Sequence, residues 1–509
     1  MRRCVLQALR FPREPRPGPE IEKQEMELQI GKEESINMAE QAEQTGPFDV
    51  TVIGAGPGGY VAAIRAAQVG LKTAIIERDQ DLGGTCLLRG CIPTKELLHS
   101  AHVYDLVSDP DEFGVSIEGF KLHFDKVMAR KNKVVGRLSK GVEFLMKKNR
   151  ITVFKGHGRL EGNGRVTVTG ADGAAREVPT RHVILATGSA PRLLPGVEIK
   201  SPRVVTSDQL LDFDHVPKSM VVLGAGAVGV EFASVFKRFG SDVTILELLP
   251  RLVPIEDEET SAELQKSFRR RKIQVMTSTR FESVTVHPDD VEIHYTGSDG
   301  KPGTLRAETL LIAVGRRPVT DGLGLENTRI ATDRGYIQVD EFMRTAEPNV
   351  YAIGDVIPTP WLAHVASKEG CVAAEHIAGR NPRPINYQLV PNCTYCEPEI
   401  GSVGLTEAKA REKGYEVKVG RFPFSALGKA IILGETEGFV KVVSDARYDE
   451  VLGVHIMGPH ATDLLAEACV ALGLEATTEE LGHIMHAHPT LSEAVMEAAE
   501  AVHGMSTSI

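Results

Sequence analysis

Two copies of one glycine-rich pattern constrain the fold of this chain more than any other feature. Residues 48–79 contain FDVTVIGAGPGGYVAAIRAAQVGLKTAIIERD, and residues 218–250 contain KSMVVLGAGAVGVEFASVFKRFGSDVTILELLP. In each copy an apolar run precedes a glycine-rich turn, an alanine-rich run that ends near a glycine, and a second apolar run that closes on glutamate. This order predicts a strand, a helix and a second, parallel strand, which is the βαβ unit that binds dinucleotides.

The three glycines of each copy have separate roles in such a unit. The first glycine permits a tight turn, the second lets the backbone approach a pyrophosphate, and the third lets the helix pack closely. These roles fall on Gly54, Gly56 and Gly59, and again on Gly224, Gly226 and Gly229. A lone match is weak, because structural glycine turns also fit it, but two complete units predict two bound dinucleotides.

An acidic residue closes the second strand of each copy. Glu77 and Glu247 stand where a carboxylate can accept hydrogen bonds from ribose hydroxyls. Glu247 would also repel the extra phosphate of NADP, so the second site is expected to prefer NAD, although Arg251 lies close enough to leave NADP open. Two dinucleotides on one chain imply a relay between a tightly held flavin and an exchangeable nicotinamide.

Composition excludes several other classes of protein. At ~100–200 residues per domain, 509 residues suggest about three or four domains. Lys+Arg 58 against Asp+Glu 69 gives a net charge of −11, which argues against nucleic-acid binding. No apolar run reaches the ~18–20 residues that cross a bilayer, so we expect no membrane contact. Seven cysteines are few for this length and favour a reducing compartment, where a disulfide tends to be catalytic.

The first 45 residues differ from the rest of the chain. Residues 1–13 carry four arginines and no acid, and residues 14–44 hold nine glutamates. The sequence predicts either a disordered tail or an over-extended start, because Met38 lies just before the first strand. We therefore expect a cytoplasmic protein, or a mitochondrial matrix protein if the arginine-rich start is a transit peptide.

The remaining candidate for chemistry is a cysteine pair in the run GGTCLLRGCIPTK. Cys86 and Cys91 are five positions apart, and five residues of regular helix rise ~7.5 Å. Because a disulfide tolerates Cα separations only to about 6.8 Å, a bridge requires an irregular backbone, which the neighbouring glycines and Pro93 can supply. Taken alone, the pair is equally compatible with two buried structural thiols.

Seven motifs in fixed order resemble the pyridine nucleotide–disulfide oxidoreductases, over residues 47–505. They are GAGPGGY, GGTCLLRGCIPTK, ATG at 186–188, GAGAVGVE, VGRRP, YAIGDV at 351–356 and HAHPTLSEA at 486–494. Within this family the motifs are most similar to those of members that oxidise dihydrolipoamide. The resemblance implies an α/β fold with two Rossmann-like dinucleotide-binding domains and an α+β C-terminal dimerisation domain. The expected ranges are 46–194 and 314–384 for FAD, 195–313 for NAD and 385–509 for dimerisation.

The resemblance also implies a role for each candidate residue. Cys86 exchanges with the substrate dithiol, and Cys91 passes electrons to the flavin, its thiolate favoured by the start of the following helix. Lys95 lies beside the flavin, paired with Glu231. His488 is the acid–base group, contributed to the active site by the partner subunit and oriented by Glu493, and Pro489 after it favours a cis peptide. His483 and His486 are expected to be structural.

The remaining implied positions concern the cofactors. Those expected to bind FAD are Gly54, Gly56, Gly59, Glu77, Thr85, Lys95, Gly158, Thr187, Gly188, Ser189, Asp355, Leu362, Ala363 and His364. Those expected to bind NAD are Gly224, Gly226, Gly229, Glu231, Glu247 and Gly315. Trp361 stands where the family usually has methionine, which is expected to alter packing near the flavin without abolishing its binding.

A second cysteine motif, Cys393 and Cys396, could suggest zinc or another redox centre. No second such motif or close histidine pair completes four ligands, so structural thiols and no metal are expected. The implied activity is NAD+-dependent oxidation of dihydrolipoyl groups on 2-oxo-acid dehydrogenase complexes or the glycine cleavage carrier, by a homodimer. A glutathione-type or mercuric-type reductase, or a non-catalytic flavin-binding redox sensor, are the alternatives.

Overall fold

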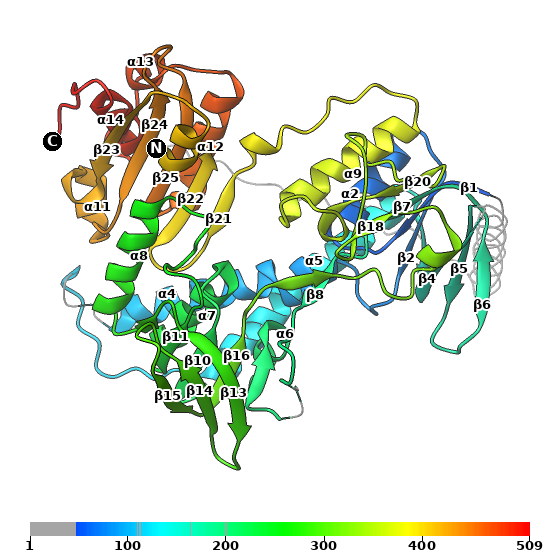
Figure 1. Cartoon of the computed structure of the whole chain (residues 1–509), viewed down its shortest axis with the longest axis horizontal. Coiled ribbons are helices and arrows are strands. Elements are labelled where there is room, and N and C mark those ends of the chain that lie inside the picture. The colour runs from blue at the N-terminus through cyan, green and yellow to red at the C-terminus, as the bar shows by residue number, and fades with distance from the viewer. Residues whose placement is uncertain (1–46, 109, 111–112, 163, 198, 200) are drawn as a thin grey trace, which may run out of the picture. The chain divides into compact units, whose positions relative to one another are not determined.

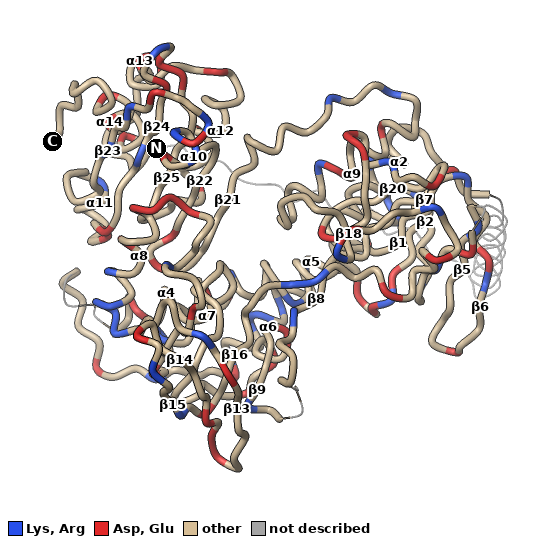
Figure 2. Tube along the Cα trace, in the orientation of Figure 1, with Lys and Arg blue, Asp and Glu red and all other residues tan. Residues whose placement is uncertain are grey.

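The computed structural model describes residues 47–108, 110, 113–162, 164–197, 199 and 201–509 (Figure 1). The tail or over-extended start expected at residues 1–45 lies outside these residues. Contacts group Phe48–Ile509 into one unit. None of the helices within the described part of the chain is long and apolar enough to span a membrane. Lys and Arg are interspersed with Asp and Glu along the trace (Figure 2).

The first βαβ unit belongs to a parallel five-stranded sheet with the order β20-β7-β1-β2-β3. Its strands are β1 (Phe48–Ile53), β2 (Thr73–Glu77), β3 (Thr152–Lys155), β7 (Thr180–Leu185) and β20 (Val350–Ala352). β1 is buried at every position except Asp49, as expected of a strand covered on both faces. The helices beside this sheet are α2 (Pro57–Gln68), α3 (Gly84–Arg89), α5 (Phe124–Lys148) and α9 (Ala363–Ile377), whereas α4 (Cys91–Ser108) packs into the core of the second parallel sheet.

Glycines allow α2 and α9 to pack very closely. A Cβ added to Gly370 would lie 2.7 Å from the carbonyl oxygen of Gly58, and one added to Gly58 would lie 3.1 Å from the Ala366 Cβ. This contact joins the first glycine turn to a helix some 300 residues later in the chain. The first sheet is therefore completed by two separate stretches of sequence.

The second βαβ unit forms another parallel sheet, in the order β12-β11-β10-β16-β9. Its strands are β9 (Val204–Thr206), β10 (Ser219–Leu223), β11 (Asp242–Leu246), β12 (Gln274–Met276) and β16 (Thr309–Ile312). Its helices are α6 (Ser207–Leu210), α7 (Ala227–Arg238) and α8 (Glu258–Arg270). An antiparallel sheet adjoins it, with strands β13 (Arg280–Val286), β14 (Val291–Thr296) and β15 (Pro302–Ala307).

The C-terminal region forms an antiparallel sheet in the order β21-β22-β25-β24-β23. Its strands are β21 (Asn392–Thr394), β22 (Glu399–Gly404), β23 (Val417–Pro423), β24 (Phe439–Asp445) and β25 (Val451–Gly458). Its helices are α10 (Glu407–Glu412), α11 (Gly428–Leu433), α12 (Ala461–Gly473), α13 (Thr478–His483) and α14 (Glu493–Ala501). β24 and β25 are buried throughout, so this sheet has its own core.

Short elements complete the connections. β8 (Ser189–Pro191) and β17 (Arg316–Pro318) pair with each other, which brings together the two loops that leave β7 and β16. Other short strands are β4 (His157–Gly162), β5 (Arg165–Thr169), β6 (Ala175–Val178), β18 (Thr332–Asp333) and β19 (Tyr336–Ile337). The 3₁₀ turns are Leu325–Asn327, Gly354–Val356, Tyr387–Leu389 and Phe424–Ala426.

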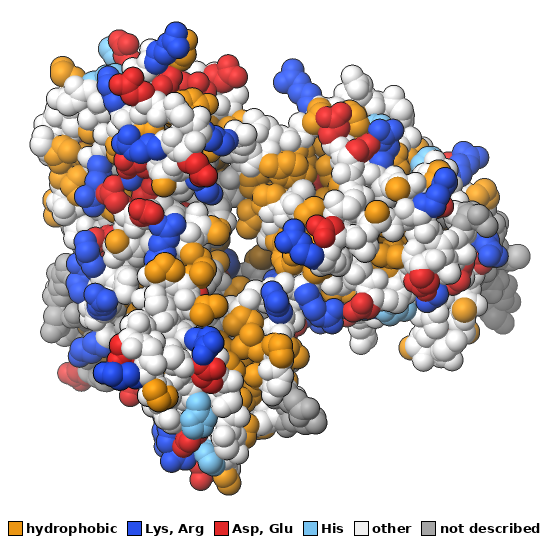
Figure 3. Space-filling view, viewed as in Figure 1, with side chains coloured by type: hydrophobic (Ala, Val, Ile, Leu, Met, Phe, Trp, Pro, Cys, Tyr) orange, Lys and Arg blue, Asp and Glu red, His pale blue; other side chains and the backbone are white. Residues whose placement is uncertain are grey.

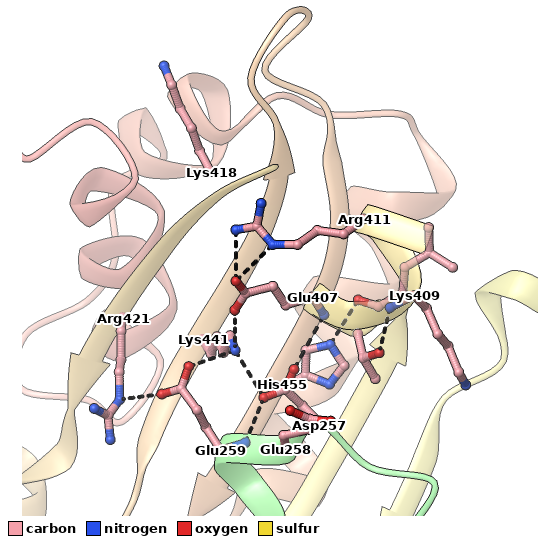
Figure 4. Close-up of polar contacts among 12 residues, drawn as sticks. Asp257, Glu258, Glu259, Glu407, Lys409, Arg411, Lys418, Arg421, Lys441 and His455 are labelled. Carbon is pink, nitrogen blue, oxygen red and sulfur yellow. Dashed lines mark hydrogen bonds and ion pairs between the residues drawn. The ribbon is translucent and has the colours of Figure 1, made fainter. Parts of the chain in front are cut away.

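A buried lysine joins the start of α8 to the C-terminal sheet (Figure 4). The Lys441 side chain on β24 is 2% exposed, and its Nζ lies 3.0 Å from Asp257, 2.7 Å from Glu259 and 2.9 Å from Glu407. Asp257 also caps α8, since its carboxylate accepts a hydrogen bond from the Glu259 N–H. A cation surrounded by three carboxylates is compensated in a way that a single buried ion pair is not.

The predicted fold class is confirmed, since two parallel dinucleotide-type sheets and an α+β C-terminal region are present. The boundaries at 194, 313 and 384 stay predictions.

Candidate functional site

The first sheet, α4, α7, α9 and α12 enclose a cavity of about 660 Å³. Figure 3 shows a hollow bordered by apolar side chains between the regions of α7, α9 and β21. Its size is within the ~300–1,000 Å³ of cofactor sites. The helix that enters it, α2, begins after Gly56 without a side-chain cap, so its first backbone N–H groups are available to a ligand. A pyrophosphate is the group that such a helix start binds best.

The first glycine turn has the geometry that a dinucleotide requires. Gly54 has a φ of +106°, and a Cβ there would lie 2.4 Å from the Ala186 carbonyl oxygen. A Cβ on Gly59 would lie 1.9 Å from the Gly54 oxygen, so this glycine serves helix packing, away from the cavity wall. Glu77 lines the cavity, and its carboxylate accepts hydrogen bonds from Ala55 N at 2.6 Å and Asp79 N at 2.8 Å. Burial raises the pKa of Glu77.

At the other end of the cavity, the Asp355 carboxylate is hydrogen-bonded to Ser189, which is itself bonded to Arg316. Ser189 Oγ donates a hydrogen bond to Asp355, and Arg316 donates to the Ser189 hydroxyl at 2.7 Å and to its carbonyl oxygen at 2.8 Å. Burial raises the pKa of Asp355. These residues come from β8, β17 and the turn after β20, so the pairing of the two crossover loops builds this end of the cavity.

The second glycine turn makes the same kinds of contact as the first. Gly224 has a φ of +104°, and its added Cβ would lie 2.4 Å from the Ala313 oxygen. The Glu247 carboxylate accepts from Ala225 N at 2.6 Å and Leu249 N at 2.7 Å. A Cβ at Gly226 would meet nothing within 4 Å, and α7 begins there without a side-chain cap. This open helix start also fits a pyrophosphate.

Arg251, which could have favoured NADP, is engaged elsewhere. Its guanidinium donates to the Pro254 carbonyl oxygen at 2.9 Å and lies 3.1 Å from the Glu258 carboxylate. The Arg251 guanidinium is therefore already paired and is not left free to bind a phosphate beside Glu247, at the end of β11.

The cysteine pair lies at a break between two helices. α3 ends at Arg89 and α4 begins at Cys91, and Gly90 between them has φ −144° and ψ −115°. The expected irregular backbone is therefore present, and Cys91 occupies the positive end of an 18-residue helix. Both cysteines are free thiols in this structure and line the cavity.

The two thiols have opposite proton affinities. The hydrogen bond between them raises the pKa of Cys86 far above its ordinary value. The same bond is the main cause of the lowered pKa of Cys91, about 7, to which the nearby Lys95 ammonium also contributes against the effect of burial. Near neutral pH the proton therefore stays on Cys86, and Cys91 becomes the thiolate.

Lys95 is paired with a carboxylate from the second βαβ unit. Its Nζ donates to the two carboxylate oxygens of Glu231, on α7, at 2.9 and 2.8 Å. Glu231 is buried, and its Oε1 also accepts a hydrogen bond from the Tyr395 backbone N–H at 3.0 Å. The Tyr395 ring covers the ammonium, with Nζ 4.5 Å from the ring centroid. The predicted Lys95–Glu231 contact is present, whereas Tyr395 carries no motif that sequence reasoning could have used.

His488 and Glu493 form a pair outside the cavity wall. His488 Nδ1 lies 2.9 Å from Glu493 Oε1, and Thr490 N donates to the other carboxylate oxygen at 2.8 Å. Although partial burial opposes it, the bonds from Thr490 and His488 lower the pKa of Glu493. The His488 side chain is 78% exposed, and the His488–Pro489 peptide is cis as expected. His486 bonds Glu467 at 2.6 Å, and His483 is exposed.

The other cysteines near the site are protonated thiols. Burial raises the pKa of Cys393 to about 12, and it raises those of Cys396 and Cys469. Cys396 is fully buried and donates to the Pro398 oxygen at 3.3 Å, whereas Cys393 and Cys469 line the cavity. Among the described residues, no group of three or more His, Cys, Asp or Glu side chains is arranged to hold a metal ion.

The cavity wall contains most of the positions expected for FAD. Besides the residues above, it includes Thr85, Gly158, Thr187, Gly188, Leu362, Ala363 and His364. Trp361 also lines it, and its indole N–H donates to the Ile357 oxygen at 3.3 Å. Of the positions expected for NAD, Glu231 lines the cavity, whereas Gly224, Gly226, Gly229, Glu247 and Gly315 lie outside its wall. Arg316 also lines the cavity, and although it belongs to the motif VGRRP, the sequence alone did not identify it as a site residue.

Comparisons with known proteins place this geometry in context. A family model described as pyridine nucleotide-disulphide oxidoreductase matches residues 48–370, and the dimerisation domain of the same family matches residues 390–499. A dihydrolipoyl dehydrogenase of Bacillus subtilis is 47% identical over 468 residues, which cover 90% of this chain and 98% of the relative. Another from Chlorobaculum tepidum is 45% identical and covers 89% and 96%.

Solved structures agree with these sequence relatives. LpdA from Mycobacterium tuberculosis is similar with a TM-score of 0.81 and 30% identity, over 89% of this chain and 99% of that one. The HOCl-induced flavoprotein disulfide reductase RclA from Escherichia coli, solved as a Cu(II) complex, has a TM-score of 0.81 and 27% identity, over 90% and 99%.

Proposed function

Because the chain belongs to the pyridine nucleotide-disulphide oxidoreductase family, we propose that it oxidises dihydrolipoyl groups to the cyclic disulfide and reduces NAD+ to NADH. One observation carries the proposal: two adjacent thiols with opposite proton affinities, Cys86 and Cys91, line a cofactor-sized cavity. The relatives named above supply the substrate class, since two of them are dihydrolipoyl dehydrogenases.

The thiol pair supports a dithiol–disulfide exchange. In the oxidised protein, one substrate thiolate attacks the Cys86 sulfur of a Cys86–Cys91 disulfide, which forms a mixed disulfide and releases Cys91 as a thiolate. The second substrate thiolate attacks the first substrate sulfur, closing the lipoyl disulfide and freeing Cys86. Two electrons have then moved from substrate to the protein dithiol. The helix start and Lys95 stabilise the charge left on Cys91.

The first site suits FAD and the second suits NAD. The turn at Gly54–Gly56 and the Glu77 carboxylate would hold the adenosine half of FAD, with Asp355 near the ribityl chain and Lys95 near the flavin ring. When bound, FAD accepts the electron pair of the dithiol and delivers it to NAD+. Glu247, together with the engagement of Arg251 by Pro254 and Glu258, supports NAD over NADP.

The active site requires a second copy of the chain. His488 is exposed and is not part of the cavity wall of its own chain, while its partner Glu493 keeps the imidazole oriented. We assign His488 to the cavity of the other subunit, where its free nitrogen would accept a proton from a substrate thiol. The lipoyl group would be carried by another protein, a 2-oxo-acid dehydrogenase complex or the glycine cleavage carrier.

One assay tests the substrate. The purified protein with FAD is mixed with NAD+ and free dihydrolipoamide, and NADH absorbance is followed. NADH formation is expected, and C86S should abolish it while keeping the bound flavin. No NADH, but turnover with NADPH and oxidised glutathione, would overturn the substrate assignment in favour of a glutathione-type reductase. No turnover with any of these would favour a redox sensor.

A further inference from the structure

The C-terminal sheet sends one aromatic side chain into the cavity, that of Tyr395. Tyr395 directly follows β21, and its ring covers the Lys95 ammonium at 4.5 Å. The same residue donates its backbone N–H to Glu231 at 3.0 Å. Tyr395 therefore contacts both members of the charged pair, one through its side chain and the other through its backbone.

The two contacts act on different atoms. Lys95 Nζ has the Glu231 carboxylate on one side, at 2.8 and 2.9 Å, and the ring face of Tyr395 on another. An ammonium is attracted to an aromatic face by the quadrupole of the ring. Since Glu231 is also fixed by the Tyr395 backbone, the ring is the part of the arrangement that a substitution can remove alone.

The position of this ammonium matters to Cys91. Lys95 lies one helical turn after Cys91 on α4, and its charge is one of the causes that lower the pKa of that thiol to about 7. Coulomb energy depends on distance, so an ammonium that moves away stabilises the thiolate less. The titratable groups that face Cys91 are Cys86, Tyr60, Lys95, Glu231 and Tyr395.

Of these neighbours, Lys95 is the one cation. Burial raises the pKa values of Tyr60 and Tyr395, so both phenols are neutral near pH 7. Glu231 opposes the Cys91 thiolate. Despite its burial, Lys95 has a raised pKa because of Glu231, so it remains charged.

We propose that Tyr395 is a positioning residue, whose ring holds the Lys95 ammonium where it stabilises the Cys91 thiolate. The inference deepens the proposed function, because it rests on Cys91 being a thiolate of the redox pair. It makes the C-terminal sheet a contributor to the cavity of its own chain, in addition to the His488 that we assign to the other subunit.

Two substitutions separate the ring from its packing volume. Tyr395→Phe keeps the ring face and loses the hydroxyl, whereas Tyr395→Met keeps a similar apolar volume without a ring face. Neither changes the backbone N–H that binds Glu231. Lys95→Met removes the ammonium altogether, so it gives the largest rise in the pKa of Cys91 that displacement of the ammonium can produce.

The readout is the pH dependence of Cys91 alkylation. The holoenzyme is reduced with dithiothreitol, desalted without oxygen and treated with iodoacetamide, and the Cys91 peptide is quantified by mass spectrometry. The wild type and Y395F should share a midpoint near pH 7. Y395M should raise the midpoint by about half a unit or more, and K95M should raise it further.

Three results would overturn the inference. The first is a midpoint for Y395M equal to that of Y395F. The second is an unshifted K95M, because the ammonium would then not stabilise the thiolate. The third is loss of flavin or folding in Y395M but not Y395F, which would make the role one of packing. Failure of the proposed function would appear separately, as a wild-type protein that forms no NADH from dihydrolipoamide.

Discussion

At the scale of single residues, the environment of each cysteine decides its chemistry. Cys91 has a pKa of about 7 because of its hydrogen bond from Cys86, and because of Lys95. Cys393 faces the same cavity but has a pKa of about 12, because burial and nearby acidic groups raise it by more than the Lys95 ammonium lowers it. At neutral pH the thiolate fractions of these two groups differ by several orders of magnitude. The cavity can therefore hold additional thiols without their entering the exchange.

His488 and Glu493 give the residue-scale prediction. His488→Gln should lower the rate of NADH formation by ~10²–10⁴-fold, the usual contribution of a general base. Glu493→Gln should have a smaller effect, because the amide can still bond the imidazole. His483→Gln is the control, since His483 is exposed and plays no part in the proposed chemistry. Steady-state rates at saturating NAD+ measure the effect, with flavin absorbance showing that each variant is loaded. Equal rates for H488Q and H483Q would contradict the role.

At the scale of elements, two glycines of the second glycine turn have different roles, one in folding and the other in cofactor binding. Gly224 has a positive φ, and a Cβ there would clash with the Ala313 carbonyl oxygen. Gly226 has an ordinary φ of −71°, and a Cβ there would meet no atom within 4 Å. The sequence pattern predicted both roles, because spacing alone identifies the turn and the helix start. It could not predict that Arg251 bonds Pro254 and Glu258, since that depends on how the loop after β11 folds.

Alanine at these two positions should therefore affect different properties, stability at Gly224 and NAD+ binding at Gly226. Gly224→Ala is expected to cost about 2 kcal/mol or more of stability, because the backbone or the sheet must shift. Gly226→Ala should leave the unfolding midpoint unchanged and weaken NAD+ binding about tenfold, because the Cβ occupies the space expected for the pyrophosphate. Thermal unfolding and NAD+ titration measure the two effects. A Gly226→Ala protein with normal NAD+ affinity would contradict the assignment of the second site.

The junction around Lys441 gives a second element-scale prediction. Lys441→Met should cost ~3–5 kcal/mol, because Asp257, Glu259 and Glu407 lose their shared cation. Arg411→Gln is the control, since this exposed guanidinium pairs with Glu407 within α10 and should cost less than ~1 kcal/mol. Urea unfolding measures both. A cost for K441M no larger than that of R411Q would show that the junction contributes little.

The pH dependence of the stability of this junction has a defined sign. Although partial burial raises the pKa of Asp257, His455 and Lys441 lower it below its usual value. The hydrogen bond from Lys441 lowers the pKa of Glu407. Their contribution is present above the unfolded carboxyl pKa of ~4 and is lost as pH falls through the folded values. The pKa of Lys441 is raised, so its own contribution is constant below ~pH 10. The difference between wild type and K441M should therefore shrink below about pH 4.

At the scale of the whole molecule, the sequence predicted the order of the three sheets but not how their side chains meet. The glycine units and the family motifs identified the fold class and the contact of Lys95 with Glu231, 136 residues apart. Tyr395 and the Lys441 junction were not predictable, because neither carries a local pattern and both depend on packing between sheets. The resemblance implied that His488 serves the other subunit, which stays a prediction, and the structure adds that His488 is not part of the cavity wall of its own chain.

A mixed dimer tests the sharing of the active site. C86S and H488Q homodimers should each be inactive or nearly so. Coexpressed with different tags and purified through both, the heterodimer should recover about half of wild-type activity, since one of its two sites pairs an intact Cys86 with an intact His488. An inactive heterodimer with full flavin content would show that His488 serves the cavity of its own chain.

The central claim is that the Cys86–Cys91 pair itself receives the electrons of the dihydrolipoyl group. The most direct measurement is thiol labelling of the air-oxidised holoenzyme, without NAD+, before and after one equivalent of dihydrolipoamide, with the peptides identified by mass spectrometry. Both Cys86 and Cys91 should be unlabelled before and labelled after, with Cys371, Cys393, Cys396 and Cys469 unchanged. A pair that is labelled equally before and after, while oxidised lipoamide forms, would contradict the account.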